Sequence, residues 1–164
     1  MDYAKINEIV SEQEKALRFD HFNHKDAWEL GSFLVNRIYD NNIEMAVSIR
    51  KVNGYILFQH GTEATNRNNQ NWMDRKFNTV TMMERSSFGV WAKSNISGQG
   101  IAEHGLSEKD YAFCGGGFPI WLKSGEMVGV LIVSNLPHEQ DHKFIIDSLQ
   151  EYLDVQVPSV EWEE

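Results

Sequence analysis

The feature that most constrains the fold is a pair of apolar segments, residues 118–122 and 127–133, separated by Lys-Ser-Gly-Glu. Two short apolar segments joined by a glycine-containing turn are typical of a β-hairpin. The second segment has no polar residue, which indicates a central strand buried on both faces. Pro137 suits the first position of a helix, and apolar residues then recur at helical spacing up to Leu153. Residues 112–153 therefore predict a glycine-led hairpin followed by a C-terminal helix.

Two helices are predicted near the start of the chain. Residues 2–16 and residues 24–40 carry apolar side chains at helical spacing. Asn23 and Asp26 have the spacing of a capping box, which marks the start of the second helix. Residues 17–22 partly alternate between apolar and polar side chains, and this pattern indicates a short strand between the two helices.

A second hairpin is expected in the middle of the chain. Asn53-Gly54 is the preferred residue pair for a tight hairpin turn, and it lies between the alternating residues 45–49 and the apolar residues 55–58. A helix is predicted to start within residues 66–71 and to end near Glu84. Ser86-Ser87 suits the start of a further helical stretch that reaches Trp91. Residues 94–110 have a weak pattern, which we interpret as a loop with one helical turn.

This order of elements predicts an α+β fold. Five strands joined mainly by hairpins imply a mainly antiparallel five-stranded sheet, and helices must cover both of its faces in a three-layer α/β/α arrangement. The chain has 164 residues, which suits one domain. No proline-rich linker divides it, so we expect a single domain over residues 1–154. Residues 155–164 are expected to be a loosely held acidic tail.

The composition excludes several classes of partner. The formal net charge is -9, which argues against nucleic acid and against an anionic membrane surface as partners. Cys114 is the only cysteine, so no disulfide can form within the chain. No secretory signal pattern opens the sequence, and no apolar run approaches the roughly 20 residues of a membrane span. The predicted location is the cytoplasm.

Several short blocks, in this order, resemble an uncharacterised family of bacterial and fungal proteins. That family is a branch of the GlcG-like, haem-degrading-domain superfamily, which includes the HbpS-like haem-binding proteins. Two residues depart from the family pattern: Asn135 stands where the family usually has glycine, and His138 where it usually has glutamine. The blocks are Leu17-Arg-Phe-Asp-His-Phe22, Asp26-Ala-Trp28 with Leu30-Gly31, Asn71-Trp72 with Arg75-Lys76, Ser86-Ser87, Gly116-Gly-Phe-Pro-Ile120, and Val128-Gly129 through Val133-Ser-Asn-Leu-Pro137 to Asp141-His142.

The resemblance extends from about Leu17 to Leu153 and implies a profilin-like fold with a five-stranded antiparallel sheet between helices. It also implies a homo-oligomer, a dimer or larger. Haem enters as a possible cofactor through this resemblance alone. No haem-ligating histidine can be matched residue by residue, so none is assigned.

Candidate ligand-binding residues come from four parts of the sequence. Arg75 suits a bidentate clamp on a carboxylate or phosphate, although a core tryptophan beside surface charges is the simpler interpretation of that segment. The glycines after Cys114 precede a strand, so they are either a bulge or a close backbone approach, or a pocket lined by N–H groups. The serines are either ligand hydroxyls or helix caps, and Cys114 is either a small buried side chain or a thiol nucleophile. The candidates are Trp72, Arg75, Lys76, Ser86, Gly115, Gly116, Gly117, Phe118, Asp141 and His142.

Residues 138–142 read His-Glu-Gln-Asp-His, the H-E-x-x-H pattern of zinc proteases. This spacing places His138 and His142 on one face of a helix as candidate metal ligands, with Glu161 or Glu163 as a third. The pattern lies in the first turn of a helix, where solvated polar residues and helix-dipole partners are the simpler interpretation.

The leading functional hypothesis is an oligomeric small-ligand-binding or regulatory domain without clear catalytic machinery, and its ligand is expected to be a small anion. The first alternative is a haem-binding or haem-degrading protein. The second is a structural or partner-binding module. Whether the chain is an enzyme stays open at this point.

Overall fold

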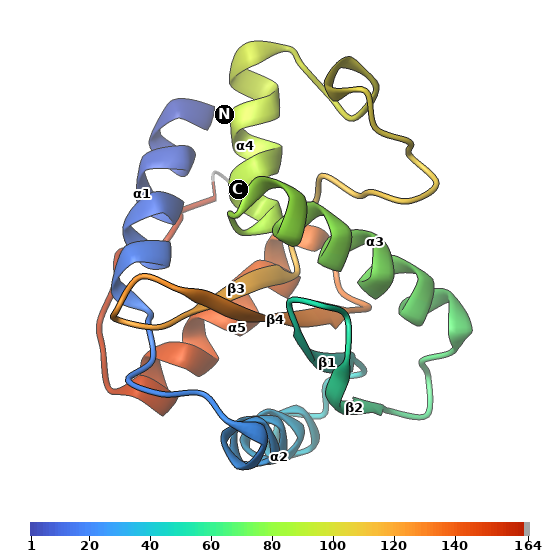
Figure 1. Ribbon diagram of the computed structural model, residues 1–164, viewed down its shortest axis with the longest axis vertical. Coiled ribbons are helices and arrows are strands. Elements are labelled where there is room, and N and C mark those ends of the chain that lie inside the picture. The colour runs from blue at the N-terminus through green and yellow to red at the C-terminus, as the bar shows by residue number, and fades with distance from the viewer. Residues whose placement is uncertain (163–164) are drawn as a thin grey trace.

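The computed structural model describes residues 1–162. Within these residues the chain forms five α-helices, one 3-10 turn and four strands, which confirms the α+β class (Figure 1). In chain order the elements are α1 (Tyr3–Ala16), α2 (His24–Asp40), β1 (Ala46–Lys51), β2 (Ile56–Gly61), α3 (Arg67–Met83), α4 (Ser87–Ser97), the 3-10 turn η1 (Ala102–His104), β3 (Gly117–Trp121), β4 (Met127–Ser134) and α5 (His138–Leu153).

The sheet is antiparallel and has the strand order β2-β1-β4-β3. It consists of the two predicted hairpins, which join where β1 pairs with β4: Val47 lies opposite Val133, and Ile49 opposite Leu131. The four side chains of these pairs are fully buried. The apolar run of β4 is therefore covered on both faces, as its lack of alternation predicts.

The prediction of a fifth strand at residues 17–22 is wrong. Only Phe19 pairs with the sheet there, in an isolated parallel bridge with Leu122. Its N–H donates to the carbonyl of Trp121, and its carbonyl accepts from the N–H of Lys123, both at 2.8 Å. The segment has no room for more pairing, because Leu17 is the C-cap of α1 and Asn23 the N-cap of α2.

Helices cover both faces of the sheet, so the structure has three layers (Figure 1). On one face α2 and α5 pack against β1 and β4 in the largest apolar cluster, where Leu30, Leu34 and Ile145 are fully buried. On the opposite face α3 packs against β4 through Met73 and Val80. Burial of each such side chain contributes about 1.5–3 kcal/mol. Helix α4 lies beside α3, and α1 packs against α4 in a third cluster around Phe88.

Local sequence signals set the ends of the helices. The capping box predicted for α2 is present, because Asn23 Oδ1 accepts from the Asp26 N–H at 2.8 Å and Asp26 Oδ2 accepts from the Asn23 N–H at 2.7 Å. Helix α4 runs to Ser97 and not to Trp91, since the left-handed residue that ends it is Gly98, with φ of 72°. Pro137 is the N-cap of α5, one position earlier than predicted.

Residues 155–162 pack against the body of the protein, although the sequence suggested a loosely held tail. The N–H of Val157 donates to Gln150 Oε1 at 2.9 Å, and the carbonyl of Pro158 accepts from Gln13 Nε2 at 2.8 Å. Trp162 lies edge-on to the ring of Phe88. Among the described residues, no helix combines the length and hydropathy needed to cross a membrane.

Gly31 of α2 provides a test of this packing. A Cβ atom at this position would overlap the ring of Phe58 in β2, so Gly31→Ala is expected to reduce the free energy of unfolding by about 1–3 kcal/mol. Gly89→Ala in α4 is the matched control, because its Cβ would meet the movable guanidinium of Arg85. Urea unfolding followed by circular dichroism measures both variants. Equal losses would contradict the assigned contact between α2 and β2.

Candidate functional site

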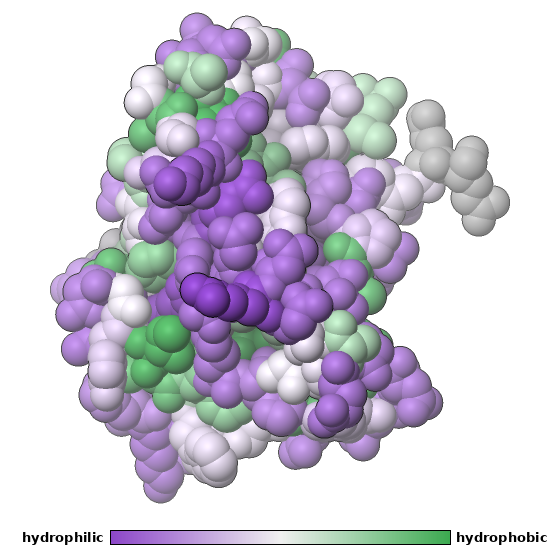
Figure 2. Space-filling model, turned by 90° about the vertical axis from the view of Figure 1, so that its right-hand side faces the viewer, coloured by the Kyte–Doolittle hydropathy of each residue, from purple (hydrophilic) through white to green (hydrophobic). Residues whose placement is uncertain are grey.

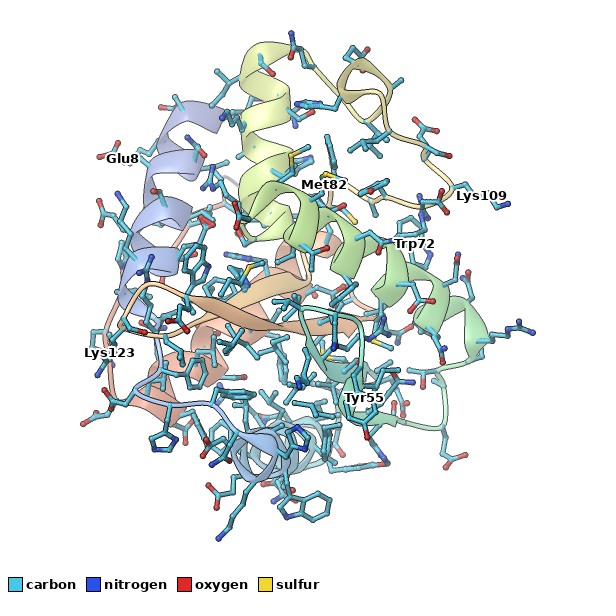
Figure 3. The ribbon with its side chains drawn as sticks, viewed as in Figure 1. Glu8, Tyr55, Trp72, Met82, Lys109 and Lys123 are labelled. Carbon is cyan, nitrogen blue, oxygen red and sulfur yellow. The ribbon has the colours of Figure 1, made fainter. Side chains whose placement is uncertain are left out.

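A pocket of about 380 Å³ lies between the first turns of α3 and the segment that joins β4 to α5. It brings together Trp72, Lys76 and Asp141 from the sequence candidates, and adds His138, which the sequence offered as a metal ligand. Figure 3 shows Trp72 on the outer side of α3. The lining residues are Asn68, Asn69, Trp72, Lys76, Cys114, Ser134, Asn135, Leu136, His138 and Asp141.

A buried ion pair forms the charged part of this pocket. Lys76 is 3% exposed and Asp141 is 1% exposed. The Lys76 Nζ atom lies 3.0 Å from Asp141 Oδ2 and 3.0 Å from the carbonyl oxygen of Val133. Since an ammonium has three N–H groups, these two contacts leave one without a partner among the described residues. The second Asp141 oxygen accepts from the N–H of Leu136 at 3.1 Å. Burial raises the pKa of Asp141, and the positive charge of Lys76 opposes this rise.

The glycine segment allows the close approach of Lys76. At Gly116, φ is 121°, and a Cβ atom there would lie 2.6 Å from Lys76 Nζ and 2.7 Å from the carbonyl of Val133. The neighbouring N–H groups are used within the fold: Gly115 donates to His138 Nδ1 at 3.0 Å, and Gly117 donates to Ser87 Oγ at 2.9 Å. Close backbone approach is therefore the role that the structure gives these glycines, and the three are absent from the pocket lining.

Arg75 and Lys76, adjacent in the sequence, make different contacts. The Arg75 guanidinium lies over the Trp72 ring, 4.3 Å from its centroid, which is a cation–π contact. Its Nε atom is buried and has no hydrogen-bond partner. Arg75 is not among the lining residues of the pocket, so its guanidinium adds positive charge beside Trp72 and does not form part of the wall.

Three of the candidate residues lie elsewhere. Phe118 is fully buried in the apolar core of β3. Ser86 is the N-cap of α4, and its hydroxyl accepts from the N–H of Gly89 at 3.1 Å. His142 stacks on Phe88 with 4.5 Å between ring centroids. Their positions favour packing and capping roles over ligand contact.

The two histidines of the H-E-x-x-H pattern each have one ring nitrogen engaged. His138 Nδ1 accepts from the N–H of Gly115, so the neutral ring carries its proton on Nε2. His142 Nε2 lies 2.8 Å from Gln13 Oε1, and its Nδ1 is buried without a partner. The described residues contain no group of three His, Cys, Asp or Glu side chains placed to hold a metal ion. Glu163, a suggested third ligand, lies outside the described residues.

Sequence reasoning missed the polar rim of the pocket. Asn69 Nδ2 lies 3.3 Å from Ser134 Oγ and 3.4 Å from Asn135 Oδ1. Asn135 has φ of 148°, a conformation that favours glycine, and this explains the asparagine at a position where the family usually has glycine. Cys114 was considered only as a core residue or a nucleophile, but it lines the pocket. Burial raises the pKa of its thiol, which is therefore protonated at neutral pH.

The fold and the site together define a three-layer α+β domain with a small polar pocket beside a buried ion pair. Comparison with known proteins identifies the family. The model of the haem degrading protein HbpS-like family matches residues 22–150. A UPF0303 protein of Paraburkholderia phymatum is 36% identical over 154 residues, which is 93% of each chain. The chain belongs to the HbpS-like family, in its UPF0303 branch, and this confirms the resemblance found in the sequence.

Two solved structures show how far the similarity extends. The crystal structure of the Ybr137w protein superposes with a TM-score of 0.84 at 27% identity, and the match covers 90% of this chain and 88% of that one. A structure described as a complex of PduOC with heme superposes with a TM-score of 0.60 at 16% identity, covering 84% of this chain and 99% of that one. The second match shows a shared fold alone.

The residues of this chain do not fit haem. A histidine ligand of haem iron needs a free ring nitrogen facing a broad apolar cavity. His138 faces the 380 Å³ pocket, but Nδ1 is engaged, Nε2 carries the proton, and most lining side chains are polar. His142 faces a cavity of about 30 Å³, which has room for about one water molecule. Neither histidine of the α5 start is thus placed as an axial ligand.

Separating the buried pair is expected to be costly. Lys76→Met leaves the Asp141 carboxylate buried without its partner, and we expect a loss of about 3–5 kcal/mol in the free energy of unfolding. Lys76→Met combined with Asp141→Leu should recover most of this loss, because no charge then stays buried. Lys143→Met is the control: it removes a surface ion pair with Asp147 and should change stability by about 0.5 kcal/mol or less. Urea unfolding tests the four proteins, and additive effects of the two core substitutions would contradict the pairing.

His142 makes stability depend on pH. Burial, aided by the nearby His138, lowers its pKa from 6.5 to about 3, so the folded state keeps the ring neutral where the unfolded state takes up a proton. Stability is therefore lost as the pH falls from 6.5 towards 3. Between pH 7 and pH 5 this histidine should cost about 2 kcal/mol. His142→Gln keeps a donor for Gln13 and should remove that part of the slope in urea titrations at the two pH values. An unchanged slope would show that His142 titrates normally.

Proposed function

We propose that this protein binds a small anionic ligand, with a carboxylate or phosphate group, in the pocket beside Lys76. The observation that carries the proposal is the third N–H group of a lysine that is 3% exposed and lines the pocket. The other two N–H groups are held by Val133 and Asp141, so the ammonium is fixed in place before any ligand arrives. A donor fixed in advance loses little entropy on binding.

Further groups around the pocket suit the same ligand class. His138 presents a protonated Nε2, because its Nδ1 accepts from Gly115. Asn69 and Asn135 contribute amide groups whose mutual contact, at 3.4 Å, is weak enough to be exchanged for a ligand. The Trp72 side chain is 37% exposed and offers an apolar surface for the body of the ligand. The Arg75 guanidinium over that ring adds the positive charge that Asp141 partly cancels at Lys76.

We favour binding over catalysis because the reactive groups of the pocket are held in inactive forms. Burial raises the pKa of the Cys114 thiol, and a protonated thiol is a poor nucleophile. His138 uses its free lone pair on the N–H of Gly115, which removes it as a general base. The pocket therefore supports recognition of a ligand better than it supports a reaction on one.

The test is a thermal-shift and calorimetric titration with inorganic phosphate and a panel of small mono- and dicarboxylates. At least one compound should raise the melting temperature, since a ligand that binds only the native state stabilises it. Trp72→Ala should weaken its affinity by about tenfold, the loss of roughly 1.4 kcal/mol of contact. Met82→Ala is the matched control, because Met82 is 51% exposed on the same helix and outside the pocket. No shift with any compound, or equal affinity of the two variants, would reject the pocket.

Haem binding is the second candidate, favoured by the family description and by the heme complex of one structural neighbour. Hemin titration separates it from the first. We expect the Soret band of hemin to be the same with and without the protein, because neither His138 nor His142 offers a free nitrogen to a cavity of suitable size. A protein-dependent Soret band that His138→Ala abolishes would replace the anion proposal with haem binding.

A further inference from the structure

The outer edge of β2 carries unpaired backbone groups. β2 pairs only with β1, and the bond from the Thr62 N–H to the Met45 carbonyl fixes the alternation of that antiparallel pair. Phe58 and His60 therefore direct their N–H and C=O groups at β1. Leu57, Gln59 and Gly61 direct theirs away from the sheet. This edge is a template on which another strand can add.

Nothing in the sequence of this edge discourages such pairing. Proteins usually protect an edge strand with proline, charged side chains or a covering segment. Residues 55–62 read Tyr-Ile-Leu-Phe-Gln-His-Gly-Thr and contain no proline and no Asp, Glu, Lys or Arg. The opposite edge of the same sheet is protected in two ways, because β3 contains Pro119 and is covered by the bridge from Phe19. The two edges thus differ where a sheet that stays alone needs both to be blocked.

Large exposed side chains lie beside the open edge. Tyr55 is 62% exposed and Ile56 is 39% exposed at the start of β2. Trp28 of α2 is 65% exposed and lies against Phe58, with 6.0 Å between ring centroids. Figure 3 shows Tyr55 beside β2, and Figure 2 shows hydrophobic areas at the height of β1, β2 and α2 on an otherwise hydrophilic side. Exposed aromatic residues next to an unpaired strand are typical of a protein interface.

The charges around this surface favour a second copy of the same chain. With a net charge of -9, two copies repel each other over most of their surface. The edge itself is uncharged, while Lys51 lies at the hairpin end of β2 and Glu63 lies just past its other end. In an antiparallel pairing about a two-fold axis, the hairpin end of one strand meets the far end of the other. Lys51 of each copy then lies near Glu63 of the other.

We propose that two copies of this chain pair through β2, antiparallel and about a two-fold axis near Gln59, so that their sheets become continuous. Leu57 of one copy would pair with Gly61 of the other, and Gln59 with its own counterpart, because these are the residues whose backbone groups face outward. Such an interface uses the same surface on both subunits, as closed two-fold dimers do. It is separate from the ligand pocket and stands whether or not the anion proposal holds.

The experiment measures molar mass by size-exclusion chromatography with light scattering. The wild type should have at least twice the chain mass of 18.9 kDa. Gln59→Pro removes only the outward N–H of that residue, so it leaves the bonds to β1 intact and should reduce the mass at least twofold. Gln59→Thr is the matched control, because it keeps the N–H and should keep the wild-type mass. Circular dichroism shows whether each variant is folded.

A second variant decides the matter if Gln59→Pro does not fold. Trp28→Lys combined with Tyr55→Lys places like charges on both sides of the proposed axis at positions exposed enough to leave the subunit fold unchanged. It should also reduce the mass at least twofold. A wild type of 18.9 kDa, or a folded edge variant that keeps the wild-type mass, would overturn the proposal.

Discussion

The contact between Lys76 and Asp141 links three elements that are distant in the sequence, and much of the surrounding structure depends on it. Lys76 reaches from α3 to the end of β4, where it binds the Val133 carbonyl, and to Asp141 in the first turn of α5. Two charges removed from water in this way need close partners at every polar atom. The requirement explains the glycine at residue 116, where any side chain would occupy the position of the ammonium.

The same contact relates stability to the pocket. Asp141 is oriented by the N–H of Leu136, so the segment between β4 and α5 is fixed by the carboxylate that also holds Lys76. Asn135 lies in this segment with φ of 148°, a conformation that costs energy for a residue other than glycine. Strain of this kind persists only where the surroundings impose it, and here they are the polar rim of the pocket. A structural ion pair and a candidate binding site thus use the same side chains.

Most of the fold could be predicted from the sequence because the decisive signals are local. The capping box at Asn23, the Asn53-Gly54 turn and the unbroken apolar run of β4 each act within a few residues. The fifth strand failed because alternation over residues 17–22 says nothing of the two helix caps at its ends. The end of α4 was placed too early, although Gly98 was a readable stop signal.

The candidate site was harder to predict, because its residues meet only through tertiary contacts. Lys76 and Asp141 were both selected, but as separate candidates and without their pairing. Arg75 has the same charge as Lys76, and only the direction of each side chain on α3 separates the guanidinium over Trp72 from the buried ammonium. Cys114 and Asn69 carry no sequence pattern that indicates a pocket. A helical period predicts which face is buried, but it does not predict which element covers that face.

The attachment of α1 has a consequence for the order in which the protein is made. Gln13 binds His142 and the carbonyl of Pro158, residues that lie 129 and 145 positions further along the chain. A ribosome releases α1 first and these partners last, so the first helix to leave the tunnel is among the last to be secured. Until then the apolar side of α1, with Ile6 and Val10, lacks the contacts that the end of the chain provides. The nascent protein therefore passes most of its synthesis with this surface uncovered, a period in which a chaperone that shields apolar helices has something to hold.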